Sequence, residues 1–448
     1  MLQLDNAFFQ CMKNTLQEDF EQYKASFDNE PFRGLRVNTL KTDAEKLASI
    51  LNIKMTKTPF YDEGFYIDNN IKGLGNHPLH HAGAFYLQEP SAMSAVSALE
   101  VQTGDKVLDL CAAPGGKSTQ IADQLKGSGL IWSNEIVGSR AKILCSNMER
   151  MGITNSVVSN AHPDVLCSKL QGYFDKVLVD APCSGEGMVR REPNAVTEWK
   201  EENRSVCADR QLKILESACK ALKNGGVMVY STCTLSGEEN ELVIDKFLQS
   251  HSEFKLEAIS KQFGRPAYTH FCDNPEITLA RRILPCDGGE GHFVARLRKC
   301  GDEDCYVGEL KLKPLADDNM FREFWQSQFN CDHGRLTQIG DSVIILPQSV
   351  PDLSGLHILK CGVEAGKFVK NRFQPEHALY MASKCEHLKN VVELDANDPL
   401  CTQFLKGAEI PCDKKGYCGV AVNGMVMGFG KASNGMLKNH YPKGLRIL

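Results

Sequence analysis

Two cysteine-bearing segments hold the residues best suited to covalent chemistry. The sequence DAPC ends at Cys183, and the sequence STC ends at Cys233, 50 residues later. Each follows an apolar run, VLV or VMVY, that is typical of a buried β-strand. A thiolate is a strong nucleophile, so two thiols at strand ends near a cofactor loop suggest covalent catalysis on an electrophilic ring.

This pair of thiols suits methylation of a pyrimidine ring at carbon 5. That carbon becomes nucleophilic only after a thiolate has added to carbon 6. Asp180 can stabilise the charge that develops at the ring nitrogen, and the second thiol can assist release of the product. The alternative for either cysteine alone is a buried structural thiol, which their shared placement disfavours. The residues themselves do not decide which thiol attacks.

An alternation of short apolar runs and amphipathic runs must position these groups. From about residue 104 to 235 we predict strands at 106–112, 129–135, 155–160, 175–180 and 225–233, with helices at 118–126, 138–151 and 201–223. This pattern indicates an α/β fold, a doubly wound and mostly parallel Rossmann-like sheet. Strands four and five are neighbours in such sheets, so both cysteines and Asp180 are expected in one crevice at the carboxyl ends of the strands.

The loop DLCAAPGGK, residues 109–117, joins the first strand to the first helix. Glycines and a helix N-terminus let a ligand approach the backbone closely. A Walker A loop fits Gly116, Lys117 and the following serine, but Cys111 stands where its first glycine belongs. The dinucleotide fingerprint G-x-G-x-x-G is absent, and a purely structural loop is the remaining alternative. S-adenosylmethionine fits better, because it predicts an acid at the end of the second strand, where Glu135 lies.

Composition is that of an ordinary soluble protein, with 42% hydrophobic and 24% charged residues and a net charge of −5. The N-terminus has no basic region of a signal peptide, and no apolar run approaches the roughly 20 residues of a membrane helix. Eighteen cysteines without a C-x-x-C pair predict neither a disulfide framework nor a metal site. We therefore expect a cytoplasmic protein. Residues 413–448 are locally basic, with Lys414, Lys415, Lys431, Lys438, Lys443 and Arg446 against one acid.

Several motifs resemble one enzyme family. The stretches DLCAAPGGKSTQIA, DAPCSGEGMVRR, YSTCT and GEGHFVARL are similar to those of the Sun/Fmu-type RNA 5-methylcytosine methyltransferases. The segments RVNTLK and HHAGAFYLQEPSAM also resemble that family. With the C-terminal KNHYPKGLR, the chain resembles the bacterial RsmF/YebU-type ribosomal RNA enzymes over nearly its full length.

The resemblance assigns roles to individual residues. It implies that Cys233 is the nucleophile and that Cys183 helps to release the methylated RNA. It places S-adenosylmethionine against Cys111, Ala112, Ala113, Pro114, Gly115, Gly116, Lys117, Glu135, Asp180 and His162. His162 stands where the family more often has an acid. Arg190 and Arg191 are expected to meet RNA phosphates, as are the lysines of the basic tail.

The resemblance also implies four domains. These are an N-terminal RNA-binding extension (1–76), the catalytic domain (77–300), a small ferredoxin-like α+β domain (301–385) and a PUA-like RNA-binding domain (386–448). Removal of the last domain is expected to weaken RNA binding without changing cofactor affinity. The predicted substrate is 16S ribosomal RNA, methylated by a monomer without a metal.

Three alternatives stay open at this point. They are a tRNA cytosine-5 methyltransferase, a non-catalytic RNA-binding ribosome assembly factor on the same fold, and a P-loop hydrolase. The second need not keep both cysteines and Glu135, and the third is disfavoured by Cys111.

Overall fold

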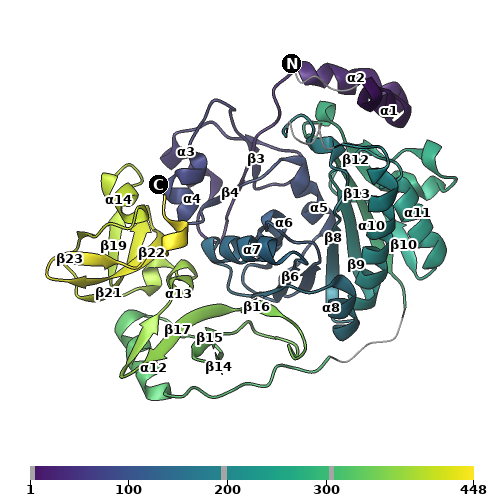
Figure 1. Cartoon of the computed structure of the whole chain (residues 1–448). Coiled ribbons are helices and arrows are strands. Elements are labelled where there is room, and N and C mark those ends of the chain that lie inside the picture. Colours follow the sequence, from purple (N-terminus) through teal and green to yellow (C-terminus); the bar gives the residue numbers. More distant parts are fainter. Residues whose placement is uncertain (1–5, 193–198, 302–306, 448) are drawn as a thin grey trace.

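The computed structural model describes residues 6–192, 199–301 and 307–447. Five parallel strands form the centre of its largest sheet (Figure 1). They are β5 (Lys106–Asp109), β6 (Leu130–Asn134), β7 (Ser156–Ser159), β8 (Phe174–Asp180) and β9 (Leu222–Thr232), in the spatial order β7-β6-β5-β8-β9. The predicted Rossmann-like core is confirmed, and β8 lies beside β9 with Asp180 opposite Ser231.

Helices cover both faces of this sheet, because its side chains point alternately into two apolar clusters. One cluster joins Leu108, Val177 and Met228 to α8 (Pro163–Lys169), α10 (Asn203–Ala221) and α11 (Glu241–Ser250). The other joins Val107, Leu178 and Val229 to α5 (Ser94–Leu99), α6 (Gly116–Leu125) and α7 (Gly138–Arg150). Strands buried on both faces are the reason that the sequence shows continuous apolar runs.

Antiparallel strands extend the sheet at both edges. Next to β9 lies β13 (His292–Lys299), followed by β12 (Arg281–Ile283) and β11 (Arg265–Pro266), while β10 (Phe254–Glu257) also pairs with β13. At the opposite edge, β16 (Ile358–Cys361) pairs with β7. The strand β16 therefore belongs to the catalytic sheet, although it lies beyond the boundary predicted at residue 300.

The N-terminal part begins with α1 (Asn6–Leu16) and α2 (Phe20–Ala25). Phe8, Met12 and Tyr23 of these helices share a small apolar cluster with Val189 and Leu235. Those two residues lie six and two positions after Cys183 and Cys233, respectively. The N-terminal helices therefore pack on the loops that carry the two thiols.

A four-stranded sheet follows, built as β1 (Gly34–Val37), α3 (Ala44–Leu51), β2 (Thr56–Lys57), β3 (Gly64–Tyr66), α4 (Pro78–His81) and β4 (Phe85–Leu87). Its antiparallel order, β2-β3-β1-β4, is that of a ferredoxin-like β-α-β-β-α-β unit. The predicted boundary at 76/77 is wrong, because it separates β4 from its partner β1.

The predicted ferredoxin-like fold of residues 301–385 is also wrong. That segment contains α12 (Asp318–Gln328), then β14 (Leu336–Ile339), β15 (Ser342–Ile345), β17 (Val363–Val369) and β18 (Arg372–Pro375), and then α13 (His377–Met381). The strands form an antiparallel sheet in chain order, with no helix between them. The missing crossover helix is what distinguishes this meander from the ferredoxin-like order.

The last unit contains β19 (Val391–Leu394), α14 (Pro399–Leu405), β20 (Ile410–Pro411), β21 (Gly416–Val422), β22 (Met425–Ser433) and β23 (Met436–Asn439). They form a five-stranded sheet in the order β19-β21-β22-β23-β20. Its apolar side chains, including Phe404 and Val420, belong to the same cluster as Leu35, Val37 and Phe85 of the N-terminal sheet. The two ends of the chain thus share one hydrophobic core.

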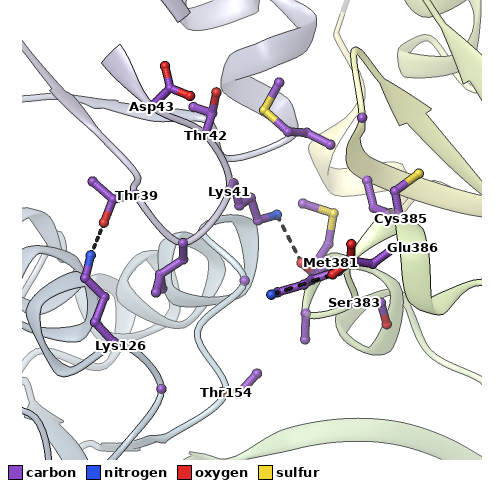
Figure 2. A pocket seen from close by; sticks show the side chains of 18 of the residues that line it. Thr39, Lys41, Thr42, Asp43, Lys126, Thr154, Met381, Ser383, Cys385 and Glu386 are labelled. Carbon is purple, nitrogen blue, oxygen red and sulfur yellow. Dashed lines mark hydrogen bonds and ion pairs between the residues drawn. The ribbon is translucent and has the colours of Figure 1, made fainter. Parts of the chain in front are cut away.

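Figure 2 shows the seam where the N-terminal, catalytic and C-terminal parts meet, around a pocket of about 690 Å³. The Lys41 ammonium donates to the carbonyl oxygens of Ala82 (2.8 Å) and Met381 (3.0 Å). Burial and the Arg150 charge lower the Lys41 pKa to about 7. The side chains of His377 and Glu149 lie 2.8 Å apart nearby. The Lys41 contacts join the N-terminal part to the C-terminal units, and the His377–Glu149 contact joins those units to the catalytic domain.

The described helices differ from a membrane-spanning helix in length, in apolar character or in both. None of them is both long enough and apolar enough to cross a bilayer.

Candidate active site

The carboxyl ends of β8 and β9 bring the two cysteine segments together. The amide of Ala181 donates to the carbonyl oxygen of Ser231 at 2.8 Å, so the chains leave the sheet side by side. The sulfur atoms of Cys183 and Cys233 lie 3.3 Å apart, and both cysteines are half-buried. Two thiols at this distance can share a proton.

The loops after the strands are fixed to each other. The hydroxyl oxygens of Ser184 and Thr234 lie 2.8 Å apart, and the Gly187 amide donates to the Cys233 carbonyl oxygen at 2.9 Å. A Cβ atom at Gly187 would lie 2.9 Å from that oxygen and 2.5 Å from the carbonyl oxygen of Gly291. Residue 187 must therefore remain glycine for the Cys233 loop to keep its position.

Asp180 forms an ion pair beside the thiols. Its carboxylate accepts from the Lys117 ammonium at 2.8 Å and from the Ser231 hydroxyl at 2.8 Å. Burial alone lowers the Lys117 pKa, but the charge and hydrogen bond of Asp180 outweigh it and raise the pKa. Lys117 therefore stays cationic at neutral pH and links the cofactor loop to the catalytic loops.

Cys183 is the thiol that its surroundings keep protonated. Its hydrogen bond to Cys233 and its burial raise its pKa well above the ordinary value, and the charges of Cys233 and Glu239 add to the effect. Removal of a second proton from the pair would place two negative charges next to each other. The pair consequently loses its second proton with more difficulty than its first.

Contacts with α7 fix the position of the cofactor loop. Arg140 donates to the carbonyl oxygen of Ala113, and Asn147 donates to that of Pro114, both at 2.9 Å. Gly115 has a φ of 111°, which side chains rarely adopt, and α6 begins at the next residue. Burial raises the pKa of the Cys111 thiol well above its ordinary value, so this thiol stays neutral.

Asp109, at the start of this loop, provides a pH-dependent prediction. It is fully buried; one carboxyl oxygen accepts from the Ser118 hydroxyl at 2.6 Å, and the other has no partner among the described residues. Burial raises its pKa to about 7, although the hydrogen bond from Ser118 opposes the change. A carboxyl group whose pKa is raised by folding loses stabilisation as the pH rises through that value.

We therefore expect Asp109→Asn to lose less stability than the wild type between about pH 5 and pH 8, by on the order of 1–4 kcal/mol. Thermal unfolding of both proteins over this range measures the difference. Parallel pH profiles for the two proteins would contradict the expectation.

Glu135 lies at the end of β6, where the cofactor hypothesis needs an acid. It is 3% exposed, accepts from the Val137 amide at 2.9 Å and lies 3.5 Å from a nitrogen of Arg140. Sequence reasoning missed the two apolar residues that follow it, Ile136 and Val137, which are 55% and 45% exposed. An acid beside an exposed apolar pair fits a ribose and an adjoining base. The sequence signal that could have revealed this site is the apolar pair directly after the acid, at the end of the strand.

His162 lies on the neighbouring loop. It is exposed and caps α8 by accepting from the Asp164 amide at 3.3 Å. Asn160 of the same loop donates to the Glu135 carbonyl oxygen at 2.7 Å, so the two loops adjoin. A cofactor contact for His162 stays a prediction.

The two arginines after Cys183 have different environments. Arg190 is 8% exposed, lies 3.0 Å from the Glu290 carboxylate and donates to the carbonyl oxygens of Asn29 and Glu30. Its expected role in RNA binding is not supported, because this guanidinium is used inside the protein. Arg191 is exposed and stays a candidate.

The five tail lysines, Lys414, Lys415, Lys431, Lys438 and Lys443, are all exposed. In the part of the chain that the structure describes, no cluster of His, Cys, Asp or Glu side chains is arranged to hold a metal.

Models of protein families match the chain in four consecutive segments. Residues 4–90 match the N-terminal domain of 16S rRNA methyltransferase RsmF, and residues 96–298 match 16S rRNA methyltransferase RsmB/F. Residues 321–382 match the first C-terminal domain of the RsmF rRNA methyltransferase, and residues 389–447 match the RsmF PUA domain.

Solved structures share the catalytic fold. A methyltransferase homologue from Pyrococcus horikoshii is 29% identical, with a TM-score of 0.56, and the match covers 66% of this chain and 100% of that one. NSun6 from the same organism, solved with SFG, is 24% identical, with a TM-score of 0.59 over 66% of this chain and 99% of that one. The second likeness concerns the fold alone.

Full-length relatives have the same extent. The ribosomal RNA small subunit methyltransferase F of Vibrio campbellii is 32% identical over 95% of this chain and 94% of its own length. That of Aeromonas salmonicida is also 32% identical, over 95% and 93%. With its thiol pair, cofactor loop and matching domain order, the chain belongs to the family of ribosomal RNA small subunit methyltransferases F.

Proposed function

We propose that this protein methylates carbon 5 of a cytosine in small-subunit ribosomal RNA, with S-adenosylmethionine as methyl donor. The observation that carries the proposal is the thiol pair, 3.3 Å apart, beside the Lys117–Asp180 ion pair at the ends of β8 and β9. Family membership supports ribosomal RNA over the other RNA classes. The enzyme acts as a cytoplasmic monomer without a metal.

Cys233 starts the reaction as nucleophile. Its thiolate bonds to carbon 6 of the cytosine and moves electron density to carbon 5. This attack builds negative charge on the ring, which a proton donated by Asp180 to the ring nitrogen would neutralise; the nitrogen returns that proton when the double bond re-forms. S-adenosylmethionine, when bound, would supply an electrophilic methyl group for the activated carbon 5.

Release requires the second thiol. Cys183, as a thiolate, removes the proton from carbon 5, the bond between carbons 5 and 6 becomes double again, and the bond from carbon 6 to sulfur breaks. Cys233 thereby returns to its thiolate form. The net change replaces one ring hydrogen by methyl and frees one proton.

The cofactor contacts in this proposal come from three loops, those that follow β5, β6 and β7. Backbone groups of residues 111–117 would hold the methionine end, Glu135 would accept hydrogen bonds from the ribose hydroxyls, and His162 would lie beside the base. Lys117, which is bound to Asp180, ties this loop to the reacting centre.

The direct test uses small-subunit RNA, both naked and as assembled subunits. Purified protein and S-adenosylmethionine are added, and bisulfite sequencing reads each cytosine. One or a few newly protected cytosines support the proposal. No protected cytosine in either substrate, despite cofactor binding by isothermal titration, would instead favour a non-catalytic assembly factor.

A row of side chains across the C-terminal sheet supports RNA binding there. Tyr417, Lys431 and Lys438 lie opposite one another on β21, β22 and β23. The Lys431 ammonium lies 5.2 Å from the centre of the Tyr417 ring, and the His440 ring is 6.1 Å from it. Exposed cations beside aromatic rings suit an RNA backbone with unstacked bases.

We expect the double variant Lys431→Ala/Lys438→Ala to weaken RNA binding and to reduce the slope of log affinity against log salt by about two. Filter binding from low to moderate salt measures the slope. Lys255→Ala is the matched control, since Lys255 is an exposed lysine on β10, in another sheet. A double variant with the slope of the control would exclude these lysines from the RNA interface.

A further inference from the structure

The charged groups that act on the two thiols differ: the Lys117 cation interacts with Cys233, and the Glu239 carboxylate interacts with Cys183. On the Cys183 side lies Glu239, which is fully buried. Its carboxylate accepts from the Ser184 amide at 2.9 Å, from the Ser184 hydroxyl, and from the Gln211 side chain at 3.0 Å. These donors are all neutral, and no salt bridge to Glu239 exists among the described residues. Glu239 is thus a buried acid without a cation of its own.

Glu239 and Gln211 together fix the chain on both sides of Cys183. The Gln211 amide nitrogen that binds Glu239 also donates to the Pro182 carbonyl oxygen at 3.0 Å. Ser184, bound by Glu239, contacts Thr234 across the gap between the loops. The separation of the two sulfur atoms therefore depends on this carboxylate.

The other charged groups nearby are already paired. Lys117 is bound to Asp180 at 2.8 Å, and Glu186 is bound to Arg204 at 2.7 Å. Cys183 itself faces Cys233 and the Glu239 charge, and a hydrogen bond with the Gly185 backbone opposes their effect. Glu239 also interacts electrostatically with the Cys207 thiol and the Glu186 carboxylate. The local charge thus opposes ionisation of Cys183.

We propose that Glu239 is a positioning residue that holds Cys183 as the protonated partner, which leaves Cys233 as the thiol free to attack. This inference rests on the proposed function for the roles of the two thiols. It gives a physical reason for a division of labour that the sequence motifs alone leave open.

The arrangement also sets the order of events. Once Cys233 has bonded to carbon 6, its sulfur is a neutral thioether, and Cys183 has lost one of the two negative neighbours. The Cys183 proton then leaves to solvent more easily, and the resulting thiolate takes the carbon-5 proton. The Cys233 and Glu239 charges together therefore keep Cys183 protonated until the adduct exists, and formation of the adduct removes the Cys233 contribution.

Thiol alkylation tests the inference without RNA or cofactor. The full-length protein is treated with iodoacetamide at a series of pH values, and mass spectrometry of peptides reads Cys183 and Cys233 separately. In the wild type we expect Cys233 to react first and Cys183 to react only at higher pH. In Glu239→Gln the Cys183 profile moves to lower pH, with about tenfold faster alkylation at fixed pH for each unit of the shift.

Ser184→Ala is the matched control, because it removes the contacts of the Ser184 hydroxyl with Glu239 and Thr234 and keeps the Glu239 charge. We expect its Cys183 profile to stay at the wild-type pH, whereas a loosened loop alone would make it resemble Glu239→Gln. An unshifted profile in a folded Glu239→Gln protein would overturn the inference. If that variant does not fold, the wild type decides, since equal reactivity of both thiols would also overturn it.

This result is separable from the proposed function. A protein whose thiols react in the expected order but which methylates no cytosine would refute the function and leave the role of Glu239 intact. A protein that methylates cytosine with equally reactive thiols would do the reverse.

Discussion

Cys233→Ala is expected to abolish methyl transfer, with a loss of at least about 10³-fold, while S-adenosylmethionine still binds. If Cys183 is held protonated, Cys233 is the thiol of the described pair that can form the bond to carbon 6. The cofactor loop lies on a different element, between β5 and α6, so its affinity should stay unchanged. Methylation assays and isothermal titration of the same preparation measure both quantities.

Cys183→Ala provides the contrast. Attack by Cys233 remains possible, but removal of the carbon-5 proton is slow, so a covalent protein–RNA adduct accumulates on a denaturing gel. An adduct with Cys233→Ala and none with Cys183→Ala would show that the two roles are reversed.

Removal of residues 386–448 is expected to unfold more than the RNA-binding unit. Phe404, Val420 and Leu437 are almost completely buried in a cluster that also contains Leu35, Val37 and Phe85. Burial of each such side chain contributes about 1.5–3 kcal/mol, so the loss across this interface is comparable to the whole stability of a typical domain. The sequence alone predicted that residues 386–448 could be removed without an effect on cofactor affinity; the shared core predicts instead that their removal destabilises the N-terminal sheet.

Thermal unfolding and cofactor titration of the truncated chain test this point. We expect a lower Tm and weakened cofactor binding, because β1 also packs on the cofactor helix: Arg36 donates to the Thr119 hydroxyl of α6 at 2.6 Å. The Lys431→Ala/Lys438→Ala variant is the control, since it changes the RNA surface and leaves the core intact. A truncated protein with wild-type Tm would refute the shared core.

The catalytic core could be predicted from sequence because its strands are buried on both faces. Such strands give continuous apolar runs, as at 177–179 and 227–230, and chain order then places β8 beside β9. The closeness of Cys183 and Cys233 could be predicted because each follows the end of one of these two strands. The approximate places of Glu135 and Lys117 followed from the same reasoning.

Other features depended on partners that no local pattern reveals. Arg190 meets Glu290, 100 residues away, so its burial could not be read from the motif around it. The strands of the N-terminal sheet have only two to four residues, which is too short for a reliable periodicity. Glu239 follows Cys233 by six residues, but its hydrogen bonds to Ser184 and Gln211 appear only in the fold.

The shared core of the N-terminal and C-terminal sheets has a consequence for biosynthesis. Phe404 follows Phe85 by 319 residues, so translation at roughly 5–20 residues per second separates them by about 16–60 s. During that interval the apolar face of the N-terminal sheet lacks its C-terminal packing partner and is accessible to chaperones or to non-native contacts. A chain whose synthesis stops between the two points has a first sheet that lacks the C-terminal half of its core.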